Sequence, residues 1–268
     1  MSITITPINT GMCTSNPKTY HYHHSVHKYY PEITNEDKAL PVFTFLLNTG
    51  RELILVDTGM AWTERANQYH HPNSWQEEDQ AIHIALERRG YCCDDISKII
   101  FTHMHWDHTF YMGKFKNAVY FAQKKEYEFA VNPIPVYYKS YEYSGLGIEP
   151  PFAGLGHRFV LLDGEAEIVP GVRVFPTPGH SVGHQAVEVD TKDGTYIIAG
   201  DAAFLMDNFK EVPQLGYAVT PPSRFVDIVS WWNSAVEIKR RASSPDMILL
   251  THEPAMLERV AKTPVLGL

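Results

Sequence analysis

Short apolar runs bounded by turn residues recur along most of the chain and predict many β-strands. Residues 42–47 and 53–56 flank Asn48-Thr49-Gly50-Arg51 and predict a hairpin of two buried strands. A second hairpin is predicted around Asp193-Gly194, because apolar runs lie on both sides of it. Further short strands are predicted at residues 3–6, 99–101, 118–122, 158–162, 166–169 and 172–175, with turns at Asp163-Gly164 and Pro170-Gly171.

Three segments are expected to be helical, at residues 77–89, 123–131 and 224–242. Ser223 is the predicted N-cap of the last one, in which Trp231 and Trp232 are expected to pack and not to take part in chemistry. At 268 residues the chain is long enough for one large α/β domain. Strand-rich halves on either side of residue 150 fit an αββα sandwich, so we expect residues 1–268 to form a single domain.

Residues 132–156 interrupt this pattern with four prolines, four glycines and four tyrosines but no sustained period. A segment of this kind is typical of an excursion from the core and not of a second domain. One hypothesis makes it a lid or a wall of the substrate pocket, with Tyr138 and Tyr141 contacting the substrate. A structural loop or an oligomer contact is the equal alternative.

Composition narrows the class of partner. The net charge of −8 and a pI near 5.9 argue against nucleic acid, which is bound by clustered Lys and Arg. The three cysteines, Cys13, Cys92 and Cys93, form no disulfide framework, and no signal peptide or transmembrane span is evident. We therefore expect a cytoplasmic protein that acts on a small molecule, without a nucleic-acid or membrane partner; a homodimer is compatible with this expectation.

A patch of aromatic residues lies near the N-terminus, at residues 21–30, and contains His21, His23, His24 and His27. It lacks the carboxylate or cysteine partners that would fix the geometry of a metal site. The sequence therefore favours a surface or interface loop, with a metal site as the alternative.

A dense group of potential metal ligands follows the predicted strand at 99–101. In an extended segment side chains alternate, so His103, His105 and Asp107 can project to one side, and a turn into a helix would bring His108 beside them. Imidazoles and carboxylates are common ligands of transition metals. The cluster therefore indicates the start of two neighbouring metal sites, and a polar loop after a strand is the alternative.

Together with this cluster, four further segments resemble the metallo-β-lactamase-fold hydrolases: Asp57-Thr58-Gly59, residues 177–184 (TPGHSVGH), Gly200-Asp201 and Thr251-His252. The resemblance runs from about residue 40 to 255 and implies the αββα sandwich of that family with two metal ions. The implied ligands are His103, His105 and His180 for the first metal, Asp107, His108 and His252 for the second, and Asp201 as the bridge between them.

The same resemblance suggests two supporting residues. Asp57 would stabilise a metal ligand from behind, although its position also fits a simple Asp-Thr-Gly turn. His184 is expected to have a supporting or structural role, because the first metal already has three imidazoles.

Within this family, residues 178–185 and 200–204 are most similar to the N-acyl homoserine lactonase branch. Two positions differ from that branch. Phe110 lies in a stretch that is usually small and rich in glycine, so it would make the pocket wall bulkier. Phe204 stands where lactonases of this branch have a Tyr hydroxyl that polarises the substrate carbonyl, which leaves this donor unassigned and homoserine-lactone specificity open.

Two divalent metals sharing Asp201 can hold a bridging water and lower its pKa, so that hydroxide attacks a carbonyl near neutral pH. We expect hydrolytic opening of an N-acyl homoserine lactone or another small lactone, with Asp107 as the proton shuttle. Zinc suits the ligands, and manganese, iron or cobalt would fit the same residues. The alternatives are a glyoxalase II-like thioesterase, a phosphodiesterase and a non-catalytic metal-binding protein with a decayed site.

Overall fold

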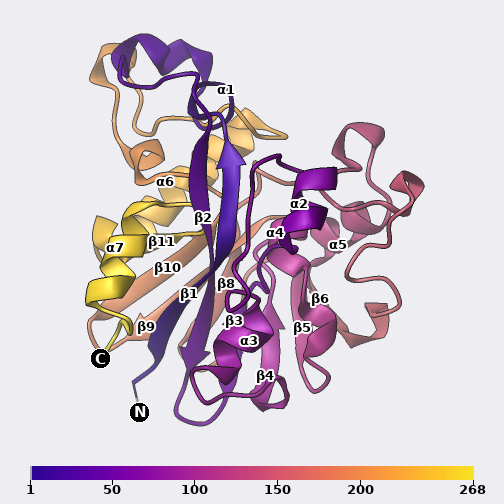
Figure 1. Cartoon of the computed structure of the whole chain (residues 1–268). Helices are drawn as coiled ribbons and strands as arrows, with labels where there is room; N and C mark the ends of the chain where they lie inside the picture. Colours follow the sequence, from indigo (N-terminus) through magenta and orange to yellow (C-terminus); the bar gives the residue numbers. More distant parts are fainter. Residues whose placement is uncertain (1) are drawn as a thin grey trace.

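Two β-sheets lie face to face at the centre of the computed structural model, which describes residues 2–268 (Figure 1). The first sheet has six strands, in the hydrogen-bonding order β1 (Thr4–Ser15), β2 (Lys38–Asn48), β3 (Leu53–Val56), β4 (Ile96–Ile100), β5 (Val119–Gln123) and β6 (Phe159–Leu162). The second sheet has five, in the order β11 (Ile248–Leu250), β10 (Gly194–Gly200), β9 (Gln185–Thr191), β8 (Val172–Pro176) and β7 (Ala166–Val169).

The first sheet is mixed. Strands β1 to β3 are antiparallel, with a short turn between β2 and β3. Strands β3 to β6 are parallel and are joined by longer crossover segments, as parallel neighbours require. The second sheet is antiparallel except for the pair β10 and β11. Both predicted hairpins are confirmed, with Phe45 opposite Val56 and Gly194 opposite Thr191.

Helices cover the outer faces of both sheets and complete four layers. In α3 and α5, Leu86 and Ala130 pack in one buried cluster with Ile99 of the first sheet, while Trp231 and Ala235 of α6 pack on the second. The predicted αββα sandwich is confirmed. The α-helices are α1 (Pro17–Tyr20), α2 (Thr63–Tyr69), α3 (Ile82–Glu87), α4 (Trp106–Thr109), α5 (Lys124–Val131), α6 (Ile228–Arg241) and α7 (Ala255–Lys262). The short 3-10 helices are η1 (His24–Tyr29), η2 (Cys93–Asp95), η3 (Met112–Lys114), η4 (Pro135–Tyr137), η5 (Ser144–Leu146), η6 (Gly156–Arg158), η7 (Met206–Phe209), η8 (Pro213–Leu215) and η9 (Pro245–Met247).

The core between the sheets explains why the central strands are continuously apolar. Val56 and Ile100 of the first sheet are buried in one cluster with Val174, Val187 and Ile198 of the second. Alternate residues of these strands face the helices instead, so both faces of each strand are covered. The central strands therefore form a rigid base. The segments that follow β3, β4, β8, β10 and β11 carry the histidines and aspartates of the predicted metal site.

The edges of the sheets differ from the sequence-based expectation. β1 extends over 12 residues instead of the predicted 3–6, because its polar residues pair with β2 across an irregularity between Asn9 and Met12 and hide the alternating pattern. Asp163-Gly164 lies between two strands as predicted, but these strands do not pair with each other. It joins β6 in the first sheet to β7 in the second, so the chain changes sheets at this turn.

The helices also begin later than the sequence indicates. The segment expected at 77–89 forms a helix only over Ile82–Glu87. The predicted N-cap Ser223 is wrong, since its hydroxyl donates to the carbonyl of Tyr22 and Asp227 caps α6 by accepting from the backbone N–H of Val229 at 3.0 Å. α6 has 14 residues, and within residues 2–268 no helix combines the length and the apolar character needed to cross a membrane.

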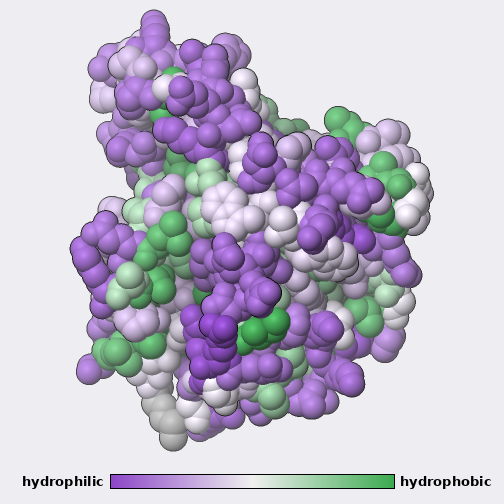
Figure 2. Space-filling model, viewed as in Figure 1, coloured by the Kyte–Doolittle hydropathy of each residue, from purple (hydrophilic) through white to green (hydrophobic). Residues whose placement is uncertain are grey.

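The N-terminal aromatic patch, residues 21–30, is part of a small lobe formed by α1, η1, η7 and η8, and it is not a simple surface loop. α1 and η1 pack beside the segment with η7 and η8, seen in Figure 1 where the indigo helices meet the orange loop. Tyr22, Val26 and Val212 form the buried centre of this lobe. The Tyr22 hydroxyl donates to Asp207 at 3.0 Å, and the backbone N–H of His23 donates to Pro221 at 2.9 Å. On the face shown in Figure 2 the lobe is mostly hydrophilic.

The N-cap correction can be tested by stability measurements. Asp227→Ala is expected to lower the free energy of unfolding by about 1 kcal/mol, because the first turn of α6 loses its side-chain acceptor. Asp227→Asn keeps an acceptor at the same position and is expected to change stability by less than about 0.5 kcal/mol. Urea unfolding monitored by circular dichroism measures both, and equal losses in the two variants would contradict this role.

Candidate metal centre

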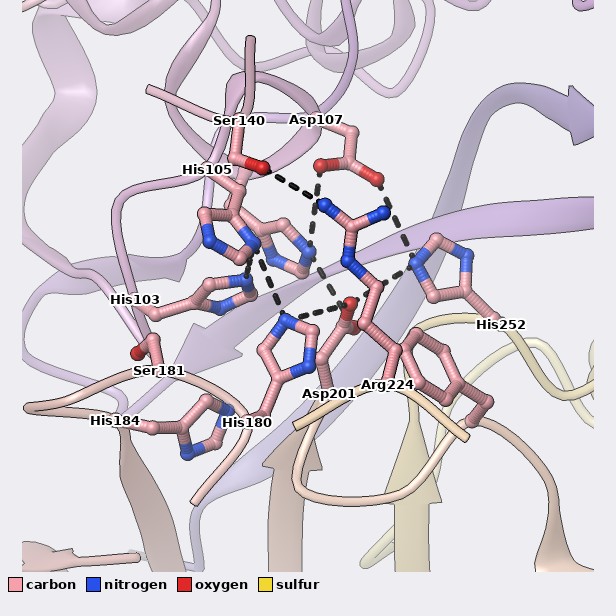
Figure 3. Close-up of polar contacts among 12 residues, drawn as sticks. His103, His105, Asp107, Ser140, His180, Ser181, His184, Asp201, Arg224 and His252 are labelled. Atoms are coloured by element: carbon pink, nitrogen blue, oxygen red, sulfur yellow. Dashed lines mark hydrogen bonds and ion pairs between the residues drawn. The ribbon is translucent and has the colours of Figure 1, made fainter. Parts of the chain in front are cut away.

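The seven predicted ligands lie together after the ends of β4, β8, β10 and β11, with Asp107 and His108 in the short helix α4. Figure 3 shows the labelled ligands converging. This is the arrangement in which a rigid scaffold can hold converging side chains. All seven are buried. Within residues 2–268 their ligand atoms form three groups, each within 4.8 Å: His103, His105 and His180; His103, His108 and Asp201; and Asp107, His108 and His252.

Three imidazoles face one another in the first group. Nε2 of His103 lies 2.9 Å from Nδ1 of His105, and Nε2 of His180 lies 3.1 Å from the same Nδ1. The Thr102 hydroxyl donates to Asp57 and can accept from Nδ1 of His103 at 3.1 Å. This assignment leaves a lone pair on Nε2 of His103, directed at the other two rings, as a three-histidine metal site requires.

Asp201 lies between the first group and the second. Its Oδ2 is 3.6 Å from Nε2 of His180 and 3.3 Å from Nε2 of His252, and its Oδ1 is 3.3 Å from Nε2 of His108. Asp107 approaches the second group from another side, with Oδ2 3.6 Å from Nε2 of His252. One carboxylate is therefore within reach of two neighbouring ions.

The donor set fits divalent transition metals. Nε2 of His108 and Oδ1 of Asp201 are buried, and neither makes a hydrogen bond within the part of the chain that the structure describes. Their contact with each other, at 3.3 Å, is an ion pair without hydrogen-bond geometry, whereas buried polar atoms nearly always make hydrogen bonds. A cation can bind the imidazole nitrogen and the carboxylate oxygen at the same time, and groups of histidine and aspartate suit zinc and similar metals.

Burial and neighbouring charges set the protonation of the ligands. Burial lowers the pKa of His103 and His105 well below the usual range and that of His180 to about 4, so these imidazoles are neutral near pH 7. Burial also lowers the pKa of His108, but nearby carboxylates, Asp201 first among them, raise it to a final value well above the usual one. A metal ion would compete with that proton for the same nitrogen.

Asp57 holds His108 from behind. Its Oδ2 lies 2.8 Å from Nδ1 of His108, which leaves Nε2 directed at the metal ligands, and its Oδ1 accepts from the backbone N–H of Thr102 at 2.8 Å. Asp57 has φ of 63°, in the left-handed region that costs a non-glycine residue about 1–3 kcal/mol. The strained backbone brings the carboxylate from the end of β3 to the histidine.

His184 lies behind the first group and belongs to none of the three ligand groups found within residues 2–268. Its Nδ1 is 2.8 Å from the Thr177 hydroxyl, and its ring centroid is 5.1 Å from that of His103. A Cβ atom at Gly200 would lie 2.7 Å from the Thr102 hydroxyl and 3.0 Å from Nε2 of His184. Glycine at this position therefore lets the end of β10 approach closely enough to place Asp201.

Glu126 is a functional residue that the sequence analysis missed. Its buried carboxylate joins the two ligand loops, because Oε1 accepts from the backbone N–H of Met104 at 3.0 Å and Oε2 accepts from the Ser181 hydroxyl at 2.7 Å. The hydroxyl of Tyr141 and the backbone N–H of Gly183 donate to the same carboxylate at 2.9 and 3.0 Å. Only its place on the inner face of α5 could have pointed to it, and that place depends on tertiary packing.

A cavity of about 250 Å³ lies beside the ligands. Most of its wall is polar, and Figure 3 shows the guanidinium of Arg224 pointing toward the ligands. Neither Tyr20, from the N-terminal lobe, nor Arg224, from the segment before α6, was expected here, because no local pattern relates them to the cluster. The wall includes Tyr20, His105, Asp107, Lys139, Asp201 and Arg224.

Phe204 is not among the described residues that line this cavity, and its side chain is buried at 1% exposure. Its ring is 5.3 Å from that of His180 and 5.9 Å from that of His252, so it packs on ligands of both groups. The ring of Tyr20 covers it at 5.2 Å. Phe204 therefore supports the histidines, while Tyr20 faces the cavity.

The segment 132–156 supplies part of the cavity wall through Val136, Lys139 and Ser140. The two tyrosines expected to line the pocket are elsewhere: Tyr138 stacks on Tyr143, and Tyr141 is buried behind His105 with its hydroxyl on Glu126. Lys139 and Ser140, which lie between the two tyrosines in the sequence, line the cavity instead.

Phe110 is also outside this wall within residues 2–268. Its ring contacts that of Trp62 at 5.0 Å, and both residues line a separate hollow. The bulky residue therefore does not narrow the cavity beside the ligands.

A buried ion pair attaches the segment 132–156 to α2. Glu142 accepts two hydrogen bonds from Arg65, both at 2.8 Å, and lies 2.8 Å from Nε2 of His70. The His70 ring stacks on Trp106 with centroids 4.1 Å apart. These contacts connect the cavity wall to the loop that carries His105 and Asp107.

Comparisons with known proteins agree with this geometry. A sequence model of the Metallo-beta-lactamase superfamily matches residues 37–252. An N-acyl homoserine lactonase of Bacillus thuringiensis is 35% identical over 189 residues, which cover 66% of this chain and 70% of that protein. The N-acyl homoserine lactonase AttM of Rhizobium radiobacter is 26% identical over 197 residues, 70% of either protein.

A similar solved structure is an N-acyl homoserine lactone hydrolase with the product N-hexanoyl-L-homoserine bound at its catalytic metal centre. It has a TM-score of 0.73 and 26% identity, and the match covers 97% of both chains. The family match extends over most of the chain and contains every residue of the His/Asp cluster. This chain therefore belongs to the metallo-beta-lactamase superfamily.

Proposed function

We propose that this protein hydrolyses the ring ester of a lactone, either an N-acyl homoserine lactone or another small lactone. The observation that carries the proposal is the position of Asp201 between two groups of histidines, beside a cavity of small-molecule size. Relatives named N-acyl homoserine lactonases support it, as does the similar structure that holds a homoserine product at its metal centre.

The metal ions belong to this proposal, with zinc as the expected element. His103, His105 and His180 would hold one ion, Asp107, His108 and His252 the other, and Asp201 both. When bound, two divalent ions supply Lewis acidity and a water molecule of lowered pKa.

The chain's own residues would orient the substrate and move its proton. Hydrolysis breaks the bond between the carbonyl carbon and the ring oxygen, and the alkoxide that leaves must receive a proton. Asp107 lines the cavity beside His252, so its carboxylate can carry that proton.

Tyr20 is the candidate donor to the substrate carbonyl, in place of the hydroxyl that Phe204 lacks. It covers the Phe204 ring and lines the cavity. Burial raises the pKa of Tyr20 well above its usual value, so the hydroxyl keeps its proton and can donate it in a hydrogen bond.

A cytoplasmic location is also proposed, since Cys13, Cys92 and Cys93 are all free thiols.

The reaction and the metal requirement can be tested together. Zinc-loaded protein is expected to release protons from lactones and to leave a thioester and a phosphodiester unchanged. Asp201→Asn is expected to bind fewer than two zinc ions per chain and to lose activity by at least about 100-fold, because the shared ligand is gone. Asp193→Asn, at an exposed turn at the other end of β10, serves as the control. A fully active Asp201→Asn variant, or turnover of the thioester or phosphodiester alone, would overturn the proposal.

The role of Glu126 as a positioning residue leads to a separate prediction. Glu126→Gln is expected to weaken zinc binding by about 10- to 100-fold, because the amide cannot accept all four hydrogen bonds that join the ligand loops. Chelator competition measures this affinity. Glu128→Gln, on the exposed side of the same helix, is the matched control. A lower Tm with unchanged zinc affinity would show that Glu126 only stabilises the fold.

The Tyr20 donor is tested by removing one hydroxyl. Tyr20→Phe is expected to lower kcat by about 100-fold with a small change in KM, as the loss of a donor to a developing oxyanion does. Tyr29→Phe removes a hydroxyl from the same lobe and is expected to have the activity of the unaltered protein. Steady-state kinetics on the best lactone decide between them, and equal kcat values for the two variants would exclude Tyr20.

A further inference from the structure

Arg224 places a permanent positive charge in the wall of the cavity. Its guanidinium makes one side-chain hydrogen bond, from Nη2 to the Ser140 hydroxyl at 2.9 Å. Within residues 2–268 it forms no ion pair with a carboxylate, although Asp107 and Asp201 line the same cavity. A guanidinium has five N–H donors and stays charged at any pH that proteins tolerate. Most of its donors are therefore available to a bound molecule.

The position of Arg224 is fixed before any substrate binds. Its guanidinium lies 5.2 Å from the centre of the Tyr20 ring, which supports one face, while Ser140 holds one nitrogen. Two residues later, the backbone N–H of Val226 donates to the carbonyl of Gly179 at 2.7 Å. The segment before α6 is thus attached to the loop that carries His180, so the distance between Arg224 and the ligands is set by the fold.

The charged groups around the cavity suit an anionic substrate better than a neutral one. Two divalent ions would bring four positive charges, which the buried carboxylates of Asp57, Asp107, Asp201 and Glu126 would balance. Lys139 lines the same cavity and adds another cation. Arg224 and Lys139 would then remain as cations that form no ion pair within residues 2–268. Hydrogen bonds from a guanidinium to a carboxylate are among the strongest in proteins.

The size of the cavity limits the molecule that carries this anion. Its volume is about 250 Å³, below the roughly 300–1,000 Å³ of pockets that hold drug-sized ligands. Its wall is mostly polar, and Val136 is the single aliphatic side chain in it among the described residues. A short, polar molecule fits this space better than one with a long apolar chain.

We propose that Arg224 binds a carboxylate on the substrate, so that the lactone hydrolysed by this protein is small and acidic. This proposal rests on the lactonase function proposed above and names the substrate class. The guanidinium fork matches the two oxygens of a carboxylate. Arg224 is then a specificity-determining residue, and Tyr20 and the metal ligands act on the ring ester.

The main alternative is that Arg224 stabilises charge on the ring carbonyl of any lactone. The two roles differ in their dependence on substrate charge. A carboxylate-binding residue affects only lactones that carry the acid, whereas a residue acting on the carbonyl affects acidic and neutral lactones equally.

The kinetic test compares 5-oxotetrahydrofuran-2-carboxylate with its carboxamide, which has the same ring and nearly the same size. Zinc-loaded protein is expected to prefer the acid by at least tenfold in kcat/KM. Arg224→Gln is expected to lower kcat/KM for the acid by about 10- to 100-fold, mostly through KM, and to leave the amide nearly unchanged. Arg224→Lys keeps the charge without the fork and is expected to retain part of the preference. Arg51→Gln removes an exposed arginine far from the site and controls for net charge.

A preference for the amide, or equal losses on acid and amide in Arg224→Gln, would overturn the proposal. A binding measurement keeps the test independent of turnover. Tetrahydrofuran-2-carboxylate has no ester bond to hydrolyse, and calorimetry is expected to show that it binds the zinc-loaded protein at least tenfold more tightly than it binds Arg224→Gln. Equal binding to both proteins would also overturn the proposal. If the acid binds through Arg224 but no lactone is hydrolysed, the lactonase function fails while the anion site remains.

Discussion

Histidines can share a metal only if each ring presents a lone pair to the same point, and hydrogen bonds behind the rings impose that condition here. Asp57 is within hydrogen-bond distance of His108, and Thr102 links the same carboxylate to His103. On the other side of the cluster, Glu126 joins the loops that carry His105 and His180. Two buried carboxylates outside the three ligand groups, Asp57 and Glu126, thus hold a histidine ring and the ligand loops in place.

The cavity depends on parts of the chain outside the strand-end loops. The N-terminal lobe provides Tyr20, and the segment before α6 provides Arg224. α6 in turn is held by the Trp231 indole, which donates to the carbonyl of Ala202, and by the Ser234 hydroxyl, which donates to that of Pro178. The elements that shape the substrate site are therefore bonded to the loops that hold the ligands, so the position of one depends on the other.

The electrostatics of the site differ from those of the whole protein. The chain has a net charge of −8, yet Arg224 and Lys139 face the cavity. Asp107 and Asp201 line the same cavity, so these two cations would select an anion by local contact and not through the overall field of the protein. Phe204 contributes in a different way, because its ring supports His180 and His252 where a tyrosine would have added a donor.

Local sequence patterns were enough to predict the ligand candidates and most of the strands. His103, His105, His180, Asp201 and their partners follow apolar runs that become central strands, and this local relation survives folding because strand ends converge at one edge of a sandwich. Tertiary packing determines which residues support the predicted ligands and which line the cavity beside them. Glu126, Tyr20 and Arg224 are distant from the cluster along the chain, and their roles arise from loop and helix packing that no local pattern encodes. The same reason explains why Tyr138 and Tyr141 do not line the cavity and why Asp227, not Ser223, caps α6. The direction of each of these side chains depends on contacts between segments that are distant in the sequence.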